Sequence, residues 1–277
     1  MRDSISNKYK VKHDANGNYL PIILRDDGTE KVLFDPVDCT IYPSNTCLGA
    51  FTPLKVAIYT LTWNRLELTK VMAESLKTAD YPYEWFVIDQ GSTDGTVEWL
   101  KTQKATVFYN QKNIGLAEGW NQALKAIPSD YEILVKLDND AQMLTQGWLK
   151  AMVELFKRNA TLLLSPYVEG LEKTPGGVMR QRMNADSPYS IINDTVLGAV
   201  PNIGGICFAH RKDMVKDWTF DARYEGNKDY LLCQHARRSG YFPAYMEEFR
   251  ISHQLGTSGQ KDKYPDYFKD QSNDSTK

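Results

Sequence analysis

The chain has 277 residues, a formal net charge of -2 at pH 7, 42% hydrophobic residues and 25% charged residues. This composition is ordinary for a globular protein, and the length suits one large α/β domain with elaborations or about two small domains. The near-neutral charge argues against strong non-specific binding to nucleic acid or acidic membranes.

The cysteines and the N-terminus indicate the compartment. Cys39, Cys47, Cys207 and Cys233 form no C-x-x-C pair, so the usual zinc-site spacing is absent. The spacing allows a disulfide between Cys39 and Cys47, but free thiols in a reducing compartment are the preferred interpretation. The N-terminus has no apolar signal segment, and no apolar run approaches membrane-spanning length. We therefore expect a cytoplasmic protein without an integral membrane segment.

Residues 1–53 differ in pattern from the rest of the chain. Two short strand-like runs, residues 19–24 and 31–34, flank the turn signal Asp26-Asp27-Gly28. We expect these residues to form an N-terminal β appendage.

From Lys55 onward, apolar strand patterns alternate with amphipathic helix patterns. Strands are predicted at residues 56–61, 85–88, 106–109 and 133–137, with helices between them and a further helix over 148–156. This alternation predicts an α/β fold, a Rossmann-like and mostly parallel sheet flanked by helices, with ligands bound beyond the carboxyl ends of the strands.

The second half of the chain is less regular. Residues 165–200 lose the rhythm, although 191–200 has a strand-like pattern, which returns at 203–208. A helix is predicted from Asp229 to just before Gly240, and a last strand at about 249–252. The polar chain after Gly256 is expected to be mobile.

Two carboxylates end the predicted strand at 133–137. Asp138 and Asp140 follow the apolar run one residue apart, so they point the same way if the chain is still extended. Their mutual repulsion favours a divalent cation or another cationic partner.

Polar residues also follow the other three strands. Thr62 and Asn64 follow the first, Asp89 the second and Asn113 the third, although each alone is typical of a turn or cap. No G-x-G-x-x-G or G-x-x-x-x-G-K-[ST] loop is present to bind phosphate. A bound nucleotide would therefore need another source of positive charge, such as a cation held by Asp140.

These segments together carry a resemblance. The order and spacing over about residues 55–160 resemble the donor half of a glycosyltransferase family 2 enzyme with a GT-A fold, on the segments VAIYTLTWNR (56–65), VIDQGSTDGT (87–96), NIGLAEGWN (113–121) and LDND (137–140). The resemblance implies a nucleoside-diphosphate sugar donor, most directly a UDP-sugar, a Mn²⁺ or Mg²⁺ ion, and inversion at the anomeric carbon.

The resemblance also implies roles for individual residues. Asp89 would contact the base and Asp138 the ribose. Asp140 would bind the metal, and His253 would complete the metal site. The donor-binding set it implies is Thr62, Trp63, Arg65, Asp89, Asn113, Gly115, Asp138 and Asn139. The sequence departs from the family at Gln90, where many members have a second Asp, and at Leu61, where they often have Pro.

In the second half the resemblance is fainter. The segment Gly204-Gly205 is similar to the floor of the acceptor site, and Asp229 aligns with the catalytic base, although Lys228 stands where the family has an acid. Asp229 could equally cap its helix, and the two roles are compatible because a helix N-terminus favours an ionised carboxylate. The expected domain is 54–260, with a donor half at 54–160, an acceptor half at 161–260 and a polar tail at 261–277.

Three functions compete at this point. The first is a metal-dependent, inverting glycosyltransferase. The second is a nucleotide-sugar-binding protein without transferase activity, which Lys228 favours. The third is a sugar nucleotidyltransferase, but the loop after the first strand lacks the Gly-rich basic sequence that this class needs. The expected acceptor is a glycan, or a modified nucleic-acid base if a basic face exists at Arg180, Arg182, Arg211, Arg237 and Arg238.

Overall fold

The computed structural model describes residues 9–13, 19–24, 30–32, 53–169, 189–192, 195–200, 202–223 and 228–268. At the N-terminus, β1 (Tyr9–His13), β2 (Tyr19–Leu24) and β3 (Glu30–Val32) form a three-stranded antiparallel sheet. The strands β2 and β3 form an antiparallel pair, as expected, and β1 is an addition to it; the predicted turn at residues 26–28 lies outside the described residues.

The donor half has the predicted alternation. The strands β4 (Val56–Thr62), β5 (Glu84–Asp89), β6 (Thr106–Tyr109) and β7 (Ile133–Leu137) lie in the order β7-β4-β5-β6, and all these pairs are parallel. The connecting helices are α1 (Leu66–Ser75), followed by the 3-10 turn η3 (Leu76–Thr78), α2 (Thr96–Leu100) and α3 (Leu116–Ala126). The α/β fold with a parallel donor half is thus confirmed.

The second half makes the sheet mixed. After β8 (Ala141–Met143) and α4 (Trp148–Arg158) come β9 (Leu162–Glu169), β10 (Tyr189–Ile192), β11 (Thr195–Ala199), β12 (Cys207–Arg211) with η4 (Lys212–Val215), α5 (Lys228–Arg238) and β13 (Phe242–His253). The strand β12 is antiparallel to both β7 and β9, whereas β13 is parallel to β9 and antiparallel to β8 and β11.

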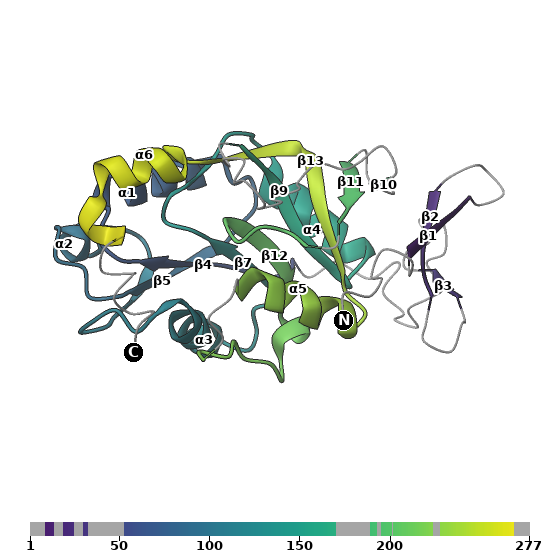
Figure 1. The fold of residues 1–277 in the computed structure, drawn as a ribbon, viewed down its shortest axis with the longest axis horizontal. Helices are drawn as coiled ribbons and strands as arrows, with labels where there is room; N and C mark the ends of the chain where they lie inside the picture. Colours follow the sequence, from purple (N-terminus) through teal and green to yellow (C-terminus); the bar gives the residue numbers. More distant parts are fainter. Residues whose placement is uncertain are drawn as a thin grey trace.

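Hydrophobic side chains cover both faces of the main sheet. Met72 of α1 and the apolar stripe of α4 pack on one face, and Trp120 of α3 and Leu232 of α5 pack on the other. In Figure 1, α1 and the yellow helix α6 (Gly256–Lys263) lie on one side of β4 and β5, and α3 and α5 lie on the opposite side. Because both faces are covered, the edge where the parallel strands end is the place for a ligand.

The C-terminal segment differs from the prediction. Residues after Gly256, expected to be mobile, form α6 (Gly256–Lys263), and helical conformation returns at 265–268. Residues 256–263 and 265–268 are thus helical, residues 269–277 lie outside the described residues, and the domain boundary at residue 260 stays a prediction. The physical reason is tertiary, since α6 has no apolar stripe and is held by polar bonds from Gln260, whose side chain is 1% exposed.

Two further expectations can be compared with the structure. Cys207 and Cys233 are buried free thiols, whereas Cys39 and Cys47 lie outside the described residues. Among the described residues, no helix combines the length and the apolar character needed to cross a membrane.

Candidate functional site

The two carboxylates after β7 lie in a turn that is fixed by backbone bonds. The Asp138 N–H donates to Ile206 O at 2.9 Å, and the Ala141 N–H donates to Asp138 O at 3.1 Å. The strand β8 then pairs with the end of β13, which sets His253 opposite Ala141. The last strand of the sheet therefore brings His253 beside the Asp-Asn-Asp motif, as the resemblance implied.

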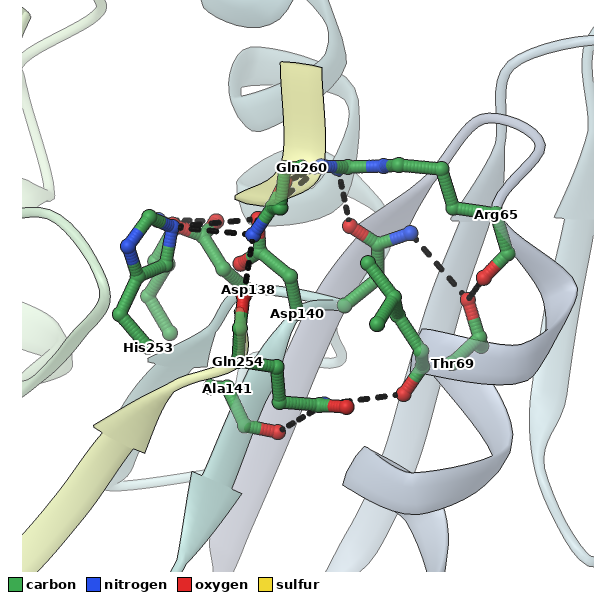
Figure 2. A network of polar contacts seen from close by, with 11 residues as sticks. Arg65, Thr69, Asp138, Asp140, Ala141, His253, Gln254 and Gln260 are labelled. Atoms are coloured by element: carbon green, nitrogen blue, oxygen red, sulfur yellow. Dashed lines mark hydrogen bonds and ion pairs between the residues drawn. The ribbon is translucent and has the colours of Figure 1, made fainter. Parts of the chain in front are cut away.

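Asp140 is the centre of a buried polar network. Its Oδ2 accepts hydrogen bonds from Arg65 Nη1 at 3.0 Å and Gln260 Nε2 at 3.1 Å, and it lies 3.5 Å from His253 Nε2. Figure 2 shows Gln260 reaching down from α6 between Arg65 and His253. Among the described residues, Asp140 Oδ1 is buried without a hydrogen-bond partner.

The charges around Asp140 keep it ionised. Burial on its own would raise the pKa of Asp140, but the His253 imidazole and the Arg65 guanidinium lower it well below its usual range. Burial would lower the pKa of His253, yet the contact with Asp140 raises it. The pair therefore favours a carboxylate beside an imidazolium when no other cation is bound.

Asp138 has its own cation, Lys136. This lysine is the second-to-last residue of β7 and is 1% exposed, and its Nζ contacts both the Asp138 carboxylate and the Gly205 carbonyl. The Trp120 ring lies 4.7 Å from the same ammonium group. Burial raises the pKa of Asp138 to about 6, and the charge of Lys136 opposes that rise. The structure thus gives each carboxylate of the motif a separate protein cation.

Asp229 lies in the first turn of α5 and faces the same lysine. Burial raises the pKa of Asp229, while the charge of Lys136 and a hydrogen bond from the Gly205 backbone oppose the rise. A Cβ atom at Gly205 would collide with the Asp229 carboxylate, so glycine is what permits this approach. The sequence predicts that Gly205 lines the acceptor site. In the structure, Gly205 also packs directly against the Asp229 carboxylate.

Asp89 holds a loop together. Its carboxylate accepts four hydrogen bonds, from Thr62 Oγ1 at 3.0 Å, Ser92 Oγ at 2.6 Å, and the N–H groups of Gly91 and Ser92. A carboxylate offers about four accepting positions, and Asp89 is 0% exposed. The expected contact between Asp89 and a base stays a prediction, and this arrangement does not favour it. The role of Thr62 in donor binding also stays a prediction, and the burial of its side chain does not favour it either.

Asn113 and Gly115 shape the loop that precedes α3. Asn113 Oδ1 accepts the Gly115 N–H at 2.9 Å, and Gly115 has φ +85°, which favours glycine. Gln90 links this loop to the end of β5, because its side chain donates to Gly115 O at 3.0 Å and accepts the Ile114 N–H at 3.2 Å. The residue that departs from the family pattern thus has a structural role.

Trp63 and Asn139 complete the donor-side set. The Trp63 ring lies 5.2 Å from the Tyr267 ring, so the C-terminal segment lies against a residue of the expected donor-binding set. Asn139 Oδ1 accepts a hydrogen bond from Arg65 Nη2 at 2.6 Å, and its Nδ2 donates to Thr69 Oγ1 at 3.2 Å. Asn139 therefore positions Arg65.

The residues around Asp140 fit a divalent cation in chemical type. An unpartnered buried carboxylate oxygen and an imidazole against the other oxygen of the same carboxylate are ligand types that Mn²⁺ accepts, and Mg²⁺ accepts the carboxylate. In the part of the chain that the structure describes, however, no three His, Cys, Asp or Glu side chains are already grouped to hold a metal. Arg65 and Gln260 occupy part of the space around Asp140.

Three residues of this site were not predicted from the sequence. Lys136 had a signal, because a lysine inside the apolar run I-L-V-K-L needs a buried anionic partner. Gln260 and Tyr267 had none, since they lie in a polar segment and reach the site only through tertiary contacts.

Two other surfaces are separate from this site. A cavity of about 450 Å³ lies where β7 begins and β12 ends, with Tyr131, Leu134 and Lys212 among its lining residues, at the sheet edge opposite the candidate site. Of the five arginines expected on a basic face, Arg211 pairs with Glu132, Arg237 bonds to Asn202, and residues 180 and 182 lie outside the described residues. These contacts give the nucleic-acid alternative no support.

The fold is similar to that of several solved structures. The mannosyltransferase PcManGT from Pyrobaculum calidifontis, solved with GDP-Man and Mn²⁺, is 20% identical with a TM-score of 0.57, covering 74% of this chain and 58% of its own. S. aureus TarS 1–349 is 18% identical with a TM-score of 0.57, covering 73% and 60%. GalNAc-T7, solved with UDP, GalNAc and Mn²⁺, is 14% identical with a TM-score of 0.57, covering 74% and 44%.

The chain therefore spans less than two thirds of the length of each of these structures. Among curated protein sequences, none matches it significantly. A family model named "Glycosyl transferase family 2" matches residues 57–219, which is more than half of the chain and runs from the second residue of β4 to beyond η4. With the fold and the motif in place, the match shows that this chain belongs to glycosyl transferase family 2.

Proposed function

We propose that the protein transfers a glycosyl group from a nucleoside-diphosphate sugar to an acceptor hydroxyl, with inversion at the anomeric carbon and Asp229 as the catalytic base. The observation that carries this proposal is the convergence of three acidic groups and their cations at one edge of the sheet. Asp138 and Asp140 end β7, and Asp229 faces Lys136 from α5.

The base assignment rests on the surroundings of Asp229. A general base works best when its pKa lies near the operating pH, and burial moves the pKa of Asp229 in that direction. The Lys136 ammonium keeps enough positive charge nearby for the carboxylate to stay ionised until it takes the proton of the acceptor hydroxyl. The Gly205 N–H holds one carboxylate oxygen in place during that transfer.

The donor side follows from the family and from the polar loops. Trp63 offers an aromatic face to the base, and Asp138 is the candidate for the ribose. Asp140 and His253 are the residues that would hold Mn²⁺ or Mg²⁺, which when bound would neutralise the departing diphosphate. The nucleotides bound in structures with this fold, GDP-Man and UDP, make UDP- and GDP-sugars the first donors to test.

The test is a donor screen with one matched pair of variants. Asp229→Asn should lower the rate of transfer or donor hydrolysis about 1,000-fold, within the range of a lost general base, while nucleoside-diphosphate affinity changes little. Asp217→Asn, an exposed acid of the same half, is the control and should behave like the wild type. Rates come from nucleoside-diphosphate release and affinities from calorimetry.

Each outcome separates a different part of the proposal. No binding of any nucleoside diphosphate at millimolar concentration would overturn the nucleotide-sugar donor. Binding without turnover on any donor would favour the non-catalytic alternative that Lys228 raised. Turnover that survives Asp229→Asn would refute the base assignment alone.

A further inference from the structure

The loop after β4 holds Arg65 in a strained backbone. Asn64 has φ 53° and Arg65 has φ 60°, so two consecutive non-glycine residues lie in the left-handed region that L-amino acids avoid. The strain is maintained by the neighbouring loop, because Ser92 Oγ accepts the Asn64 N–H and Asn64 Oδ1 accepts the Thr93 N–H, both at 2.8 Å. Backbone strain of this kind is kept where the fold holds a side chain in one fixed orientation.

That direction is toward the Asp-Asn-Asp motif. The Arg65 side chain is 7% exposed, and its guanidinium contacts Asp140 at 3.0 Å, Asn139 at 2.6 Å and Gln260 Oε1 at 2.7 Å. The Tyr267 ring lies 3.9 Å from the Arg65 Cζ atom. The cation is therefore enclosed by the motif on one side and by the C-terminal segment on the other.

The contacts of Asp140 leave room for a different partner. Its Oδ1 is buried and unpartnered, and Arg65 Nε and His253 Nδ1 are also buried without hydrogen-bond partners among the described residues. Of these atoms, the Asp140 Oδ1 lone pairs are free to bind a cation, which indicates a carboxylate that is completed by a further partner.

We propose that Arg65 is a resident counter-ion of Asp140 that competes with the divalent cation for this carboxylate. A guanidinium against Oδ2 and a metal ion on Oδ1 would place two cations on one buried carboxylate, where they repel each other. Binding of the cation therefore moves Arg65 off Asp140 and breaks its bond to Gln260, which loosens α6. This inference deepens the proposed function, because it concerns the metal at the donor site.

The first test measures Mn²⁺ binding by the full chain without nucleotide. The free ion is quantified by electron paramagnetic resonance. Arg65→Gln should bind Mn²⁺ about tenfold more tightly or better, because the competing charge is gone. Arg65→Lys keeps the charge and should stay close to the wild type. Arg223→Gln, which removes an exposed arginine from its pair with Asp221, is the matched control and should not change the affinity.

A second measurement uses the wild type alone, in case Arg65→Gln does not fold. Hydrogen exchange of α6 amides should become faster when Mn²⁺ binds, although bound ligands usually slow exchange. Slower exchange in α6 on adding Mn²⁺ would overturn the inference, because Arg65 would then have kept its hold on Gln260.

The outcomes distinguish this inference from the proposed function. Equal or weaker Mn²⁺ binding by Arg65→Gln would overturn the competition, and nucleoside-diphosphate binding measured in parallel would show whether the donor proposal stands. Adding Asp140→Asn to Arg65→Gln should abolish the gain. If the tight binding persists without Asp140, the cation lies elsewhere and the inference fails.

Discussion

At the scale of single residues, the acidic side chains of this site lie close together because a glycine leaves space for them and a lysine offsets their charge. Lys136 lies between Asp138 and the Gly205 carbonyl, and Asp229 fits only because Gly205 has no side chain. A buried lysine is expensive to desolvate, so its retention in β7 requires the two carboxylates that face it. The acidic groups and the lysine therefore stabilise one another.

The clash at Gly205 leads to a prediction. Gly205→Ala should displace the Asp229 carboxylate, and misplacement of a reacting group by about 1 Å can cost about 100-fold in rate. We expect kcat to fall by about that factor while nucleoside-diphosphate affinity, measured by calorimetry, is nearly unchanged.

A thermodynamic cycle checks the cause of that loss. Gly205→Ala should lower the free energy of unfolding in the wild type and lower it less in an Asp229→Ala background, where no carboxylate is in the way. Equal destabilisation in both backgrounds would mean that the new methyl group collides with something other than Asp229.

At the scale of elements, α6 is the part of the fold that local sequence explains least. It follows Leu255, whose φ of 64° is unusual for leucine, and it has a polar surface all round. Its attachment to the site is made by Gln260, which bonds to Arg65, Asp140 and the Gln254 carbonyl. A helix held by a few polar bonds is expected to open locally before the rest of the molecule.

The prediction for α6 follows from these bonds. Gln260→Ala should speed hydrogen exchange across Gly256–Lys263 about tenfold or more, since each lost bond contributes roughly 1 kcal/mol and several are lost together. Exchange in β4, β5 and β7 should stay as in the wild type. Lys261→Ala changes the adjacent exposed side chain and serves as the control, and similar exchange in both variants would contradict the anchoring role of Gln260.

The same contrast explains what the sequence could and could not predict. The strands β4, β5 and β7 and the helix α4 were predictable because burial imposes apolar runs and an apolar stripe on them. The position of Asp138 and Asp140 at a strand end followed from the same runs.

The parts that escaped prediction are those with no periodic signal. Nothing local marks α6, because its contacts are polar and come from residues distant in the chain. The saturation of Asp89 by Thr62, Ser92 and two backbone N–H groups also depends on a folded loop, so a residue that the family motif marks for base contact proved to be enclosed. The antiparallel insertion of β12 between β7 and β9 is likewise a matter of topology.

At the scale of the whole molecule, buried titratable groups set the response of stability to pH. His210 of β12 is buried, its Nδ1 bonds to the Arg211 carbonyl at 2.8 Å, and its ring stacks on Phe208. Burial lowers the pKa of His210 from 6.5 to about 4. The unfolded chain therefore binds a proton more readily than the folded chain in the window between these values.

The sign of the effect follows directly. Stability linked to His210 is fully present above about pH 6.5 and is lost as the pH falls toward 4, amounting to roughly 3 kcal/mol over the window. His210→Phe should show a smaller decline of unfolding free energy over this window in urea titrations, whatever its stability at neutral pH. An unchanged decline would show that other groups carry the acid sensitivity.

The long strand β13 also carries an irregularity with a wider consequence. Met246 pairs with Pro166 and Arg250 pairs with Tyr167, so residues 247–249 form a spacer between two adjacent partners on β9. Shortening this spacer by one residue would shift the end of β13 by about 3.3 Å and turn each side chain to the opposite face. The length of the spacer, and not the pairing on either side of it, therefore decides that an imidazole meets Asp140 in this chain. A change of one residue in that length would replace the histidine with its neighbour while leaving the sheet intact.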